Sequence, residues 1–257
     1  MKKKLITATI VLPLALSSAF AQDEEKPPYV APVDTFTCSY NDGKGPADMD
    51  KAAAAWNKWA DERGVADYSA MILTPYYHGA DTFDVGWLGY WTSQEAMGVG
   101  LDAYMAEGGE AEEGFNKAVT CESHEHWAAI EVKSPPDGET PDNLVLMFSN
   151  CSKSDDVEWD ALFDKIGAAM AYQEEQGFEK GDYMMWPVFG GEGEPEWDFK
   201  WVTSFANYTA FGKAYQHNAN GGGRQKMNAI MENALDCDTA RVYNAKVVRK
   251  ITAEMDE

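Results

Sequence analysis

The sequence predicts an α+β protein in which two β-α-β-β-α-β units follow one another within 257 residues. Three observations lead to this prediction. The order of Cys, Gly, Asp and Trp residues in the first half of the chain recurs in the second half. Each half shows the same alternation of strand and helix periodicity. A segment rich in Pro, Gly and Asp, residues 134–143, separates the halves and predicts a linker.

The recurrence keeps a nearly constant offset along the chain. Cys38 and Cys151 lie 113 positions apart, and Cys121 and Cys237 lie 116 positions apart. Between these ends, an Asp and a Trp recur at an offset of 114: Asp84 with Asp198, and Trp87 with Trp201. A composition rich in Gly and Trp sets no such order by itself. The pattern therefore indicates an internal duplication.

In the first unit, apolar residues at helical spacing followed by Gly64 predict the first helix. Alternating aromatic residues from Phe83 to Trp91 predict the third strand, and Ser93 is a favourable N-cap for the second helix. The expected elements of this unit are strands at 35–40, 68–77, 83–91 and 126–133, a helix at 48–63 and a second helix that starts near Ser93.

The second unit shows the same signals. A helical pattern that starts near Trp159 ends at Gly177, and Asn207 takes the N-cap place of Ser93. The expected strands of this unit are 144–150, 183–189, 197–205 and 242–249. Two connecting segments are expected to be loops, the acidic stretch 107–113 and the Gly-rich stretch 221–224.

The N-terminus carries the pattern of a secretory signal peptide. Three lysines precede an apolar run, and Ala19-Phe20-Ala21 fits a cleavage site. Residues with several prolines follow and predict an extended leader. The expected organisation is a signal peptide at 1–21, the leader at 22–32, the first unit at 33–133, the linker at 134–143, the second unit at 144–250 and an acidic tail at 251–257. We therefore expect a periplasmic or secreted protein.

The charge excludes several classes of partner. The chain has 21 Lys and Arg residues against 43 Asp and Glu residues, a formal net charge of −22. Nucleic-acid binding needs a basic surface, so no nucleic-acid partner is expected. An anionic membrane surface would repel the protein, so no membrane association is expected after signal cleavage. We expect a monomer with an internal pseudo-dimer, or a weak homo-oligomer.

The order of elements over nearly the whole mature chain resembles the dimeric α+β barrel superfamily in a fused form. The resemblance implies two ferredoxin-like sheets that face each other with pseudo-twofold symmetry and enclose a barrel. Members include cofactor-free antibiotic-biosynthesis-type monooxygenases, NIPSNAP-like proteins and haem enzymes such as chlorite dismutase. No motif selects one of these families, so the resemblance assigns no catalytic residue and no cofactor.

Four cysteines in an exported chain predict disulfides. In a ferredoxin-like sheet the end of the first strand lies beside the start of the fourth strand. The repeat and this topology both select the pairs Cys38–Cys121 and Cys151–Cys237 among the three pairings that four cysteines allow. The competing interpretation, a metal site, lacks a C-x-x-C or Cys/His spacing of the zinc type.

Aromatic residues gather on the expected second and third strands of the first unit. Tyr76, His78 and Tyr90 are the candidate ligand-binding residues because they lie at a strand end or on the second strand face. Gly86 and Gly89 lack side chains there and could leave space for a flat ligand. The competing interpretation of such strand aromatics is ordinary core.

The histidines and two repeated aspartates give weaker hypotheses. His124 and His126 lie on one side of an extended segment and are candidates for a divalent metal pair, against a simple solvated strand entry. His217 is a candidate axial haem ligand, against a surface helix histidine. Asp84 and Asp198 are candidates for a base, against a turn or capping role.

Three functions remain open from the sequence. The first is a disulfide-stabilised exported protein that binds a small apolar or aromatic ligand in a barrel cavity. The second is an enzyme of the same fold, either a cofactor-free monooxygenase or a haem enzyme. The third is a structural or interaction module of a periplasmic assembly, which would use exposed aromatic residues.

Overall fold

A computed structural model describes residues 28–80, 82–136, 140–191 and 195–252. The predicted signal peptide at 1–21, most of the leader and the end of the acidic tail lie outside these residues. Within them, no helix is both long and apolar enough to cross a membrane.

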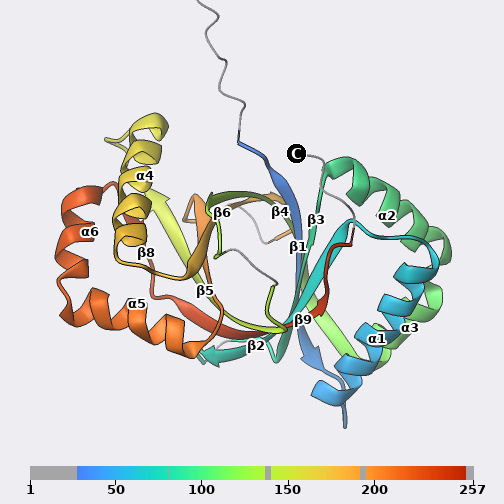
Figure 1. The fold of residues 1–257 in the computed structure, drawn as a ribbon. Coiled ribbons are helices and arrows are strands. Elements are labelled where there is room, and N and C mark those ends of the chain that lie inside the picture. The colour runs from blue at the N-terminus through green and yellow to red at the C-terminus, as the bar shows by residue number, and fades with distance from the viewer. Residues whose placement is uncertain (1–27, 81, 137–139, 192–194, 253–257) are drawn as a thin grey trace, which may run out of the picture.

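Strands of the described residues form one closed antiparallel barrel, with a layer of helices on each of two sides (Figure 1). The strand order is β7-β6-β4-β1-β3-β2-β9-β5, and β5 pairs with β7 to close the ring. A short ninth strand, β8, pairs with the end of β5. The bounds are β1 Ala31–Tyr40, β2 Tyr68–Tyr77, β3 Val85–Trp91, β4 Val119–Lys133, β5 Asn143–Lys153, β6 Lys180–Phe189, β7 Phe199–Phe205, β8 Leu235–Cys237 and β9 Arg241–Arg249.

Each half of the chain contributes four neighbouring barrel strands. The first half has the order β4-β1-β3-β2, and the second has β6-β7-β5-β9. The halves meet where β2 pairs with β9 and where β4 pairs with β6. In each half the first and fourth strands run antiparallel side by side, as a β-α-β-β-α-β sheet requires.

The six helices in the described residues divide between the two sides of the barrel (Figure 1). Helices α1, α2 and α3 cover the strands of the first half, and α4, α5 and α6 cover those of the second. Their bounds are α1 Pro46–Glu62, α2 Gln94–Glu107, α3 Gly109–Ala118, α4 Trp159–Glu175, α5 Tyr208–Asn220 and α6 Gly223–Met231. Ser93 and Asn207 cap α2 and α5, and each side chain accepts a hydrogen bond from a backbone N–H three residues later.

Two expected loops are helical. Residues 109–113 of the acidic stretch lie in α3, and residues 223–224 of the Gly-rich stretch start α6. The expectations failed because both stretches contain two or more glycines, which disfavour a helix. Ala111 and Ala118 nevertheless bury in the core beside α1, and Gly223 leaves no room for a Cβ beside His217, so tertiary contacts override the propensity.

Strands β1, β4 and β6 begin at least three residues earlier than expected. β1 begins at Ala31, inside the expected leader. Pro32 is tolerated there because it pairs with β4 alone, so its lack of an N–H removes no hydrogen bond to β3. β4 begins at Val119 and β6 at Lys180. Polar residues occupy these added ends, so the alternation that marks a half-buried strand is absent there.

Both predicted disulfides are present. Cys38 bonds to Cys121 and Cys151 bonds to Cys237, and each pair lies directly opposite in the strand register. The described residues contain no free cysteine. The first bridge joins β1 to β4, and the second joins β5 to β8.

Asp84 and Asp198 have the turn role rather than a catalytic one. The carboxylate of Asp84 accepts a hydrogen bond from the Tyr40 backbone N–H at 3.0 Å, and that of Asp198 accepts one from Lys153 at 2.7 Å. Each aspartate therefore ties the entry of the third strand to the end of the first strand in its half.

Three hydrophobic layers form the core. The barrel interior holds side chains from all eight barrel strands, among them Val33, Leu73, Leu88, Trp127, Leu146, Met185, Val202 and Tyr243. One outer layer packs the first half against α1–α3, and the other packs the second half against α4–α6. Side chains from all eight strands therefore pack together where the ligand cavity was expected, in the part of the chain that the structure describes.

Candidate functional site

An apolar pocket of about 130 Å³ lies outside the barrel, between the strands of the second half and α4, α5 and α6. Its apolar wall comes from the sheet, from the α4–β6 connection and from the helices: Met147, Phe178, Phe205, Phe211, Ala214 and Met227. Its polar side chains are Tyr172, Gln173, Lys180, Tyr215, His217 and Asn218. Helix α5, which forms one wall, contains no fully buried residue, so it packs only loosely on the sheet.

The corresponding space in the first half is filled. We treat two positions as corresponding when they hold the same place in the strand register, or the same distance from the glycine that follows the first helix. Gly64 and Gly177 both adopt the left-handed conformation, with φ of +67° and +68°. In the first half, Trp91 lies so close to α2 that a Cβ on Gly100 would sit 2.1 Å from its ring.

Smaller side chains at corresponding positions open the pocket in the second half. Tyr68 pairs with Trp91 in the first half, whereas Lys180 pairs with Phe205 in the second. Trp56, eight residues before Gly64, corresponds to Ala169, eight residues before Gly177. The first half therefore packs large aromatic rings where the second half leaves a volume that they would occupy.

Gln173 gives the pocket an unpaired polar group. Its side chain is only 9% exposed, and Oε1 has no hydrogen-bond partner in the described residues. The amide nitrogen donates to the Met227 sulfur at 3.6 Å, a weak acceptor. Whichever way the amide is oriented, one polar atom lacks a strong partner, which costs about 1–3 kcal/mol for a buried group.

His217 and Tyr172 form a polar pair beside the pocket. His217 Nε2 and the Tyr172 hydroxyl are 2.7 Å apart, and the Phe178 ring packs edge-on against the imidazole at 5.3 Å. The pair joins α5 to α4, and both side chains line the pocket. It could therefore accept or relay a proton from a molecule bound there.

Lys180 and Asp182 form a buried ion pair on the sheet side of the pocket. The Lys180 Nζ lies 2.7 Å from Asp182 Oδ2, and Asp182 is fully buried. Asp182 Oδ1 also accepts hydrogen bonds from Trp201 and Thr203. Because the carboxylate neutralises the lysine, the wall presents no net charge to a ligand.

The structure does not bring Tyr76, His78 and Tyr90 together. Tyr90 pairs with Ser69 on β2, and Tyr76 is seven residues farther along β2, roughly 23 Å away at the rise of a strand. Tyr76 is exposed and packs against Tyr208 of α5, and His78 is exposed at the strand end. Tyr90 points into the barrel, and burial raises the pKa of its hydroxyl.

The glycines between these aromatics leave no space for a flat ligand. A Cβ on Gly89 would sit 1.7 Å from the Tyr68 hydroxyl, because that ring lies over the glycine. A Cβ on Gly86 would meet Phe83 at 3.1 Å. The protein's own aromatic side chains occupy the room that these glycines provide, which favours the core interpretation.

His124 and His126 share one face of β4, as expected, but each has a protein partner. His126 is 8% exposed, and its Nδ1 lies 3.0 Å from Asp34 Oδ1, whose other oxygen accepts a bond from Trp91. The His124 ring stacks on Phe36 with centroids 3.8 Å apart. Within the described ranges, no group of three or more His, Cys, Asp and Glu residues is placed to hold a metal ion.

Comparisons with known proteins show the fold alone. No protein-family model matches the sequence, and no curated protein matches it. A proposed chlorite dismutase is 12% identical with a TM-score of 0.50, over 86% of this chain and 96% of its own. A proposed monooxygenase from Lactobacillus acidophilus NCFM is 10% identical with a TM-score of 0.51, over 86% and 95%. An anthrone oxidase-like protein is 13% identical with a TM-score of 0.50, over 86% and 92%. The chain therefore has the dimeric α+β barrel fold.

The superfamily includes haem enzymes, but the residues of this pocket do not fit a haem. His217 is the imidazole that lines the pocket, and its Nε2 is engaged with Tyr172. The volume of about 130 Å³ is below the roughly 300–1,000 Å³ of sites for drug-sized ligands and cofactors. We derive no chemistry through a haem.

Sequence reasoning missed this pocket, although one signal was present. Alignment of the halves at the offsets of the repeat sets Trp56 against Ala169 and Trp91 against Phe205. A loss of aromatic volume in one copy only is the pattern expected of a cavity. Residues that recur in both halves mark the scaffold, whereas the positions at which the halves differ mark the pocket.

Proposed function

We propose that this protein binds a single-ring aromatic molecule that carries a hydrogen-bond donor, in the pocket under α5. The observation that carries the proposal is the unpaired Gln173 Oε1 in a pocket whose wall is mostly apolar. A donor on the ligand would satisfy this oxygen, and the ring would contact Phe205, Phe211 and Met227. The affinity would then come from apolar burial and the orientation from one hydrogen bond.

The pocket volume supports a ligand of this size. A dry apolar cavity of roughly 150 Å³ binds benzene, so about 130 Å³ suits one six-membered ring rather than a fused ring system. The neutral Lys180–Asp182 pair and the apolar wall disfavour a charged ligand. Phenol is the smallest probe with both required features.

The proposal includes the wider organisation expected from the sequence. We infer an exported protein with a cleaved signal peptide at 1–21, because two disulfides suit a periplasmic or extracellular compartment. We also infer two tandem ferredoxin-like units, 33–133 and 144–250, joined by the linker 134–143. Their pseudo-twofold contact would replace the interface that separate chains make as a dimer.

Methyl NMR of methionine tests the proposed ligand. Met147 and Met227 line the pocket, whereas Met49 lies in the core of the first half. We expect phenol to shift the Met147 and Met227 methyl signals of the mature protein and to leave Met49 unchanged. Toluene, which has the same shape without the donor, should bind several-fold more weakly, since one buried hydrogen bond contributes about 1 kcal/mol.

The variant Gln173→Leu provides the matched comparison. It removes the unpaired amide and should bring phenol and toluene to similar affinities. If phenol shifts neither pocket methionine, or if it shifts Met49 equally, the proposal is wrong. Equal binding of phenol and toluene by the wild type would refute the role of Gln173 alone.

A cofactor-free oxygenase is the second candidate function. The observation that favours it is the His217–Tyr172 pair at the pocket, which could take the hydroxyl proton from a bound phenol. Oxygen consumption by the purified protein with phenol, compared with a His217→Gln variant, tests it. Binding without oxygen uptake would leave the protein as a binding protein only.

A further inference from the structure

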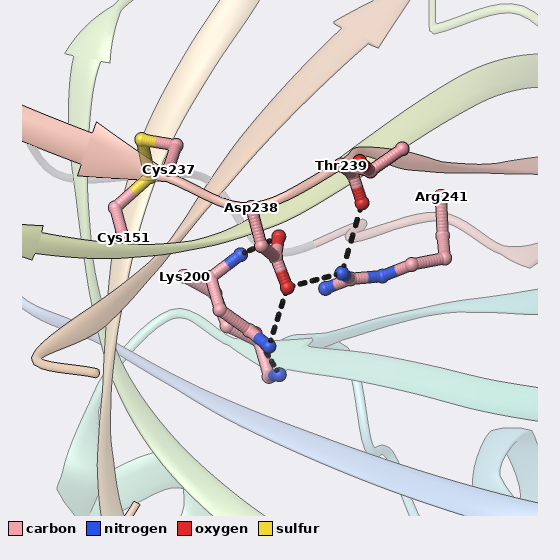
Figure 2. A network of polar contacts seen from close by, with 7 residues as sticks. Cys151, Lys200, Cys237, Asp238, Thr239 and Arg241 are labelled. Atoms are coloured by element: carbon pink, nitrogen blue, oxygen red, sulfur yellow. Dashed lines mark hydrogen bonds and ion pairs between the residues drawn. A yellow bond between two sulfur atoms is a disulfide. The ribbon is translucent and has the colours of Figure 1, made fainter. Parts of the chain in front are cut away.

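A second group of polar residues lies at one end of the barrel and is built around Lys200. Lys200 Nζ donates a hydrogen bond to Asn150 Oδ1 at 2.8 Å. Asn150 binds Asp238 through its backbone and side-chain nitrogens, and Arg241 pairs with the same carboxylate (Figure 2). The Cys151–Cys237 disulfide flanks this network and fixes Asp238 beside Asn150.

The Lys200 side chain points into the barrel. Along β7 it shares a face with Val202, which belongs to the interior layer. Its Nζ lies 4.4 Å from the centre of the Trp197 ring and 5.2 Å from that of Trp127, and these two rings stack on each other. The ammonium is therefore held between an aromatic wall and an amide oxygen, in a position that two cation–π contacts stabilise.

A second cation faces the same mouth. Arg241 of β9 pairs with Phe148 of β5. Lys200 of β7, on the other side of β5, pairs with Asn150, which lies two residues farther along β5. The Cα atoms of the two cations thus lie two strand spacings apart across the sheet, roughly 10 Å, with a further offset of two residues along it. The side chains of Lys200, Arg241, Asn150 and Trp197 are all partly exposed, so solvent reaches the mouth.

Cations and carboxylates both act on Lys200. Burial is the main cause that lowers its pKa to about 8, followed by the neighbouring Arg241, while Glu125 and Asp238 oppose the shift. Arg241 already takes the Asp238 carboxylate as its partner. Lys200 itself donates to a neutral amide oxygen, so an added carboxylate would be its direct anionic partner.

The first half shows that the barrel does not need this lysine. In the strand register, Gly86 opposite Thr37 corresponds to Lys200 opposite Asn150. Glu125 opposite Thr35 likewise corresponds to Arg241 opposite Phe148. One copy of the same scaffold therefore has Gly and Glu where the other has Lys and Arg, which points to a role beyond packing.

We propose that this barrel mouth binds the carboxylate of a small aromatic acid, with Lys200 and Arg241 as its anion contacts and Trp197, stacked on the buried Trp127, as its aromatic wall. A carboxylate would supply the full negative charge that the Asn150 amide lacks. The planar guanidinium of Arg241 suits an oxygen pair, and the indole rings suit a flat ring. This site is separate from the pocket under α5 and does not depend on the function proposed there.

Benzoate is the probe for this site, with benzyl alcohol as the uncharged control. Indole ¹H–¹⁵N signals of Trp127 and Trp197 report binding at the mouth, and methyl signals of Met147 and Met227 report binding under α5. We expect benzoate to shift the two indole signals and benzyl alcohol to leave them unchanged. Lys200→Met should weaken benzoate binding at least tenfold, because it keeps the length of the side chain and removes its charge.

Lys153→Met is the matched control. That lysine also lies over a tryptophan, at 5.7 Å from Trp159, but in the outer layer of the second half. Its variant should bind benzoate within twofold of the wild type. The Lys200→Arg variant keeps a charge at the mouth and should retain binding, which protects the test if the Met variant does not fold.

The pH dependence gives an independent readout. A bound carboxylate favours the ammonium form, so affinity should be constant below pH 8 and fall as pH rises above the pKa of Lys200. Lys200→Arg should remove this fall, because arginine stays charged. Unchanged benzoate binding by Lys200→Met, equal binding of benzyl alcohol, or a response confined to Met147 and Met227 would each overturn the proposal.

Discussion

The pocket under α5 can be closed by transfer of the packing of the first half into the second. Trp91 corresponds to Phe205, and Gly100 corresponds to Ala214, since each lies seven residues after the N-cap of its helix. The double variant Phe205→Trp with Ala214→Gly therefore recreates the Trp–Gly contact across the sheet and the helix. The added ring should fill the pocket and abolish binding of phenol.

The structure sets the expected sizes of the effects on stability. In the first half a Cβ at Gly100 would lie 2.1 Å from the Trp91 ring, so Phe205→Trp alone should clash with Ala214 and cost about 1–3 kcal/mol. Ala214→Gly alone should cost about 1 kcal/mol through helix propensity. The double variant removes the clash, so its cost should be only about 1 kcal/mol, which leaves a coupling energy of roughly 1–3 kcal/mol.

Guanidinium unfolding of the four proteins measures this cycle, and methionine methyl NMR measures phenol binding. A difference of 1 kcal/mol corresponds to about 2–4 °C in melting temperature for a chain of this size. Strictly additive costs would show that the two halves do not correspond at these positions. Persistence of the phenol response in a folded double variant would show that the ligand binds elsewhere.

Three further predictions concern stability. Replacement of both Cys151 and Cys237 by Ala should lower the free energy of unfolding by about 4.5 kcal/mol in the chain-entropy model, because the bridge closes a separation of 86 residues. Denaturant unfolding with and without reductant measures this loss. Asp182→Asn should cost about 3–5 kcal/mol because it leaves a buried lysine cation without its counter-charge, whereas Asp50→Asn in an exposed ion pair should cost under about 1 kcal/mol. Burial raises the pKa of Tyr183 to about 12, so the unfolded chain loses this proton first and stability should fall from pH 10 to pH 12. Unfolding curves at pH 9, 10.5 and 11.5 measure the fall, and Tyr183→Phe should make it smaller.

The sequence was most informative where local chemistry and the repeat agreed. Ser93 and Asn207 hold the predicted caps because a side-chain acceptor at a helix start needs only its own backbone. The disulfide pairs followed because the first and fourth strands must be neighbours in a β-α-β-β-α-β sheet. Both predictions rest on contacts that a few residues or one topology rule determine.

The candidate site depended on information that one sequence holds only indirectly. Tyr76 and Tyr90 lie on neighbouring strands, as expected, yet they sit seven strand positions apart. The pocket exists because Lys180 and Phe205 leave volume that Tyr68 and Trp91 fill in the first half. Such a deficit depends on how three layers pack, and periodicity does not report it.

Closure of the barrel by two halves of one chain has a consequence for the path of folding. Until the second half is present, β2 and β4 of the first half lack their partners β9 and β6, so a nascent chain exposes two strand edges. The β2–β9 pairing joins residues 165 to 179 positions apart, which makes this step slow relative to formation of either sheet. Aggregation should therefore compete most strongly while synthesis is half complete, and a chaperone that shields β-edges would have most effect in that interval.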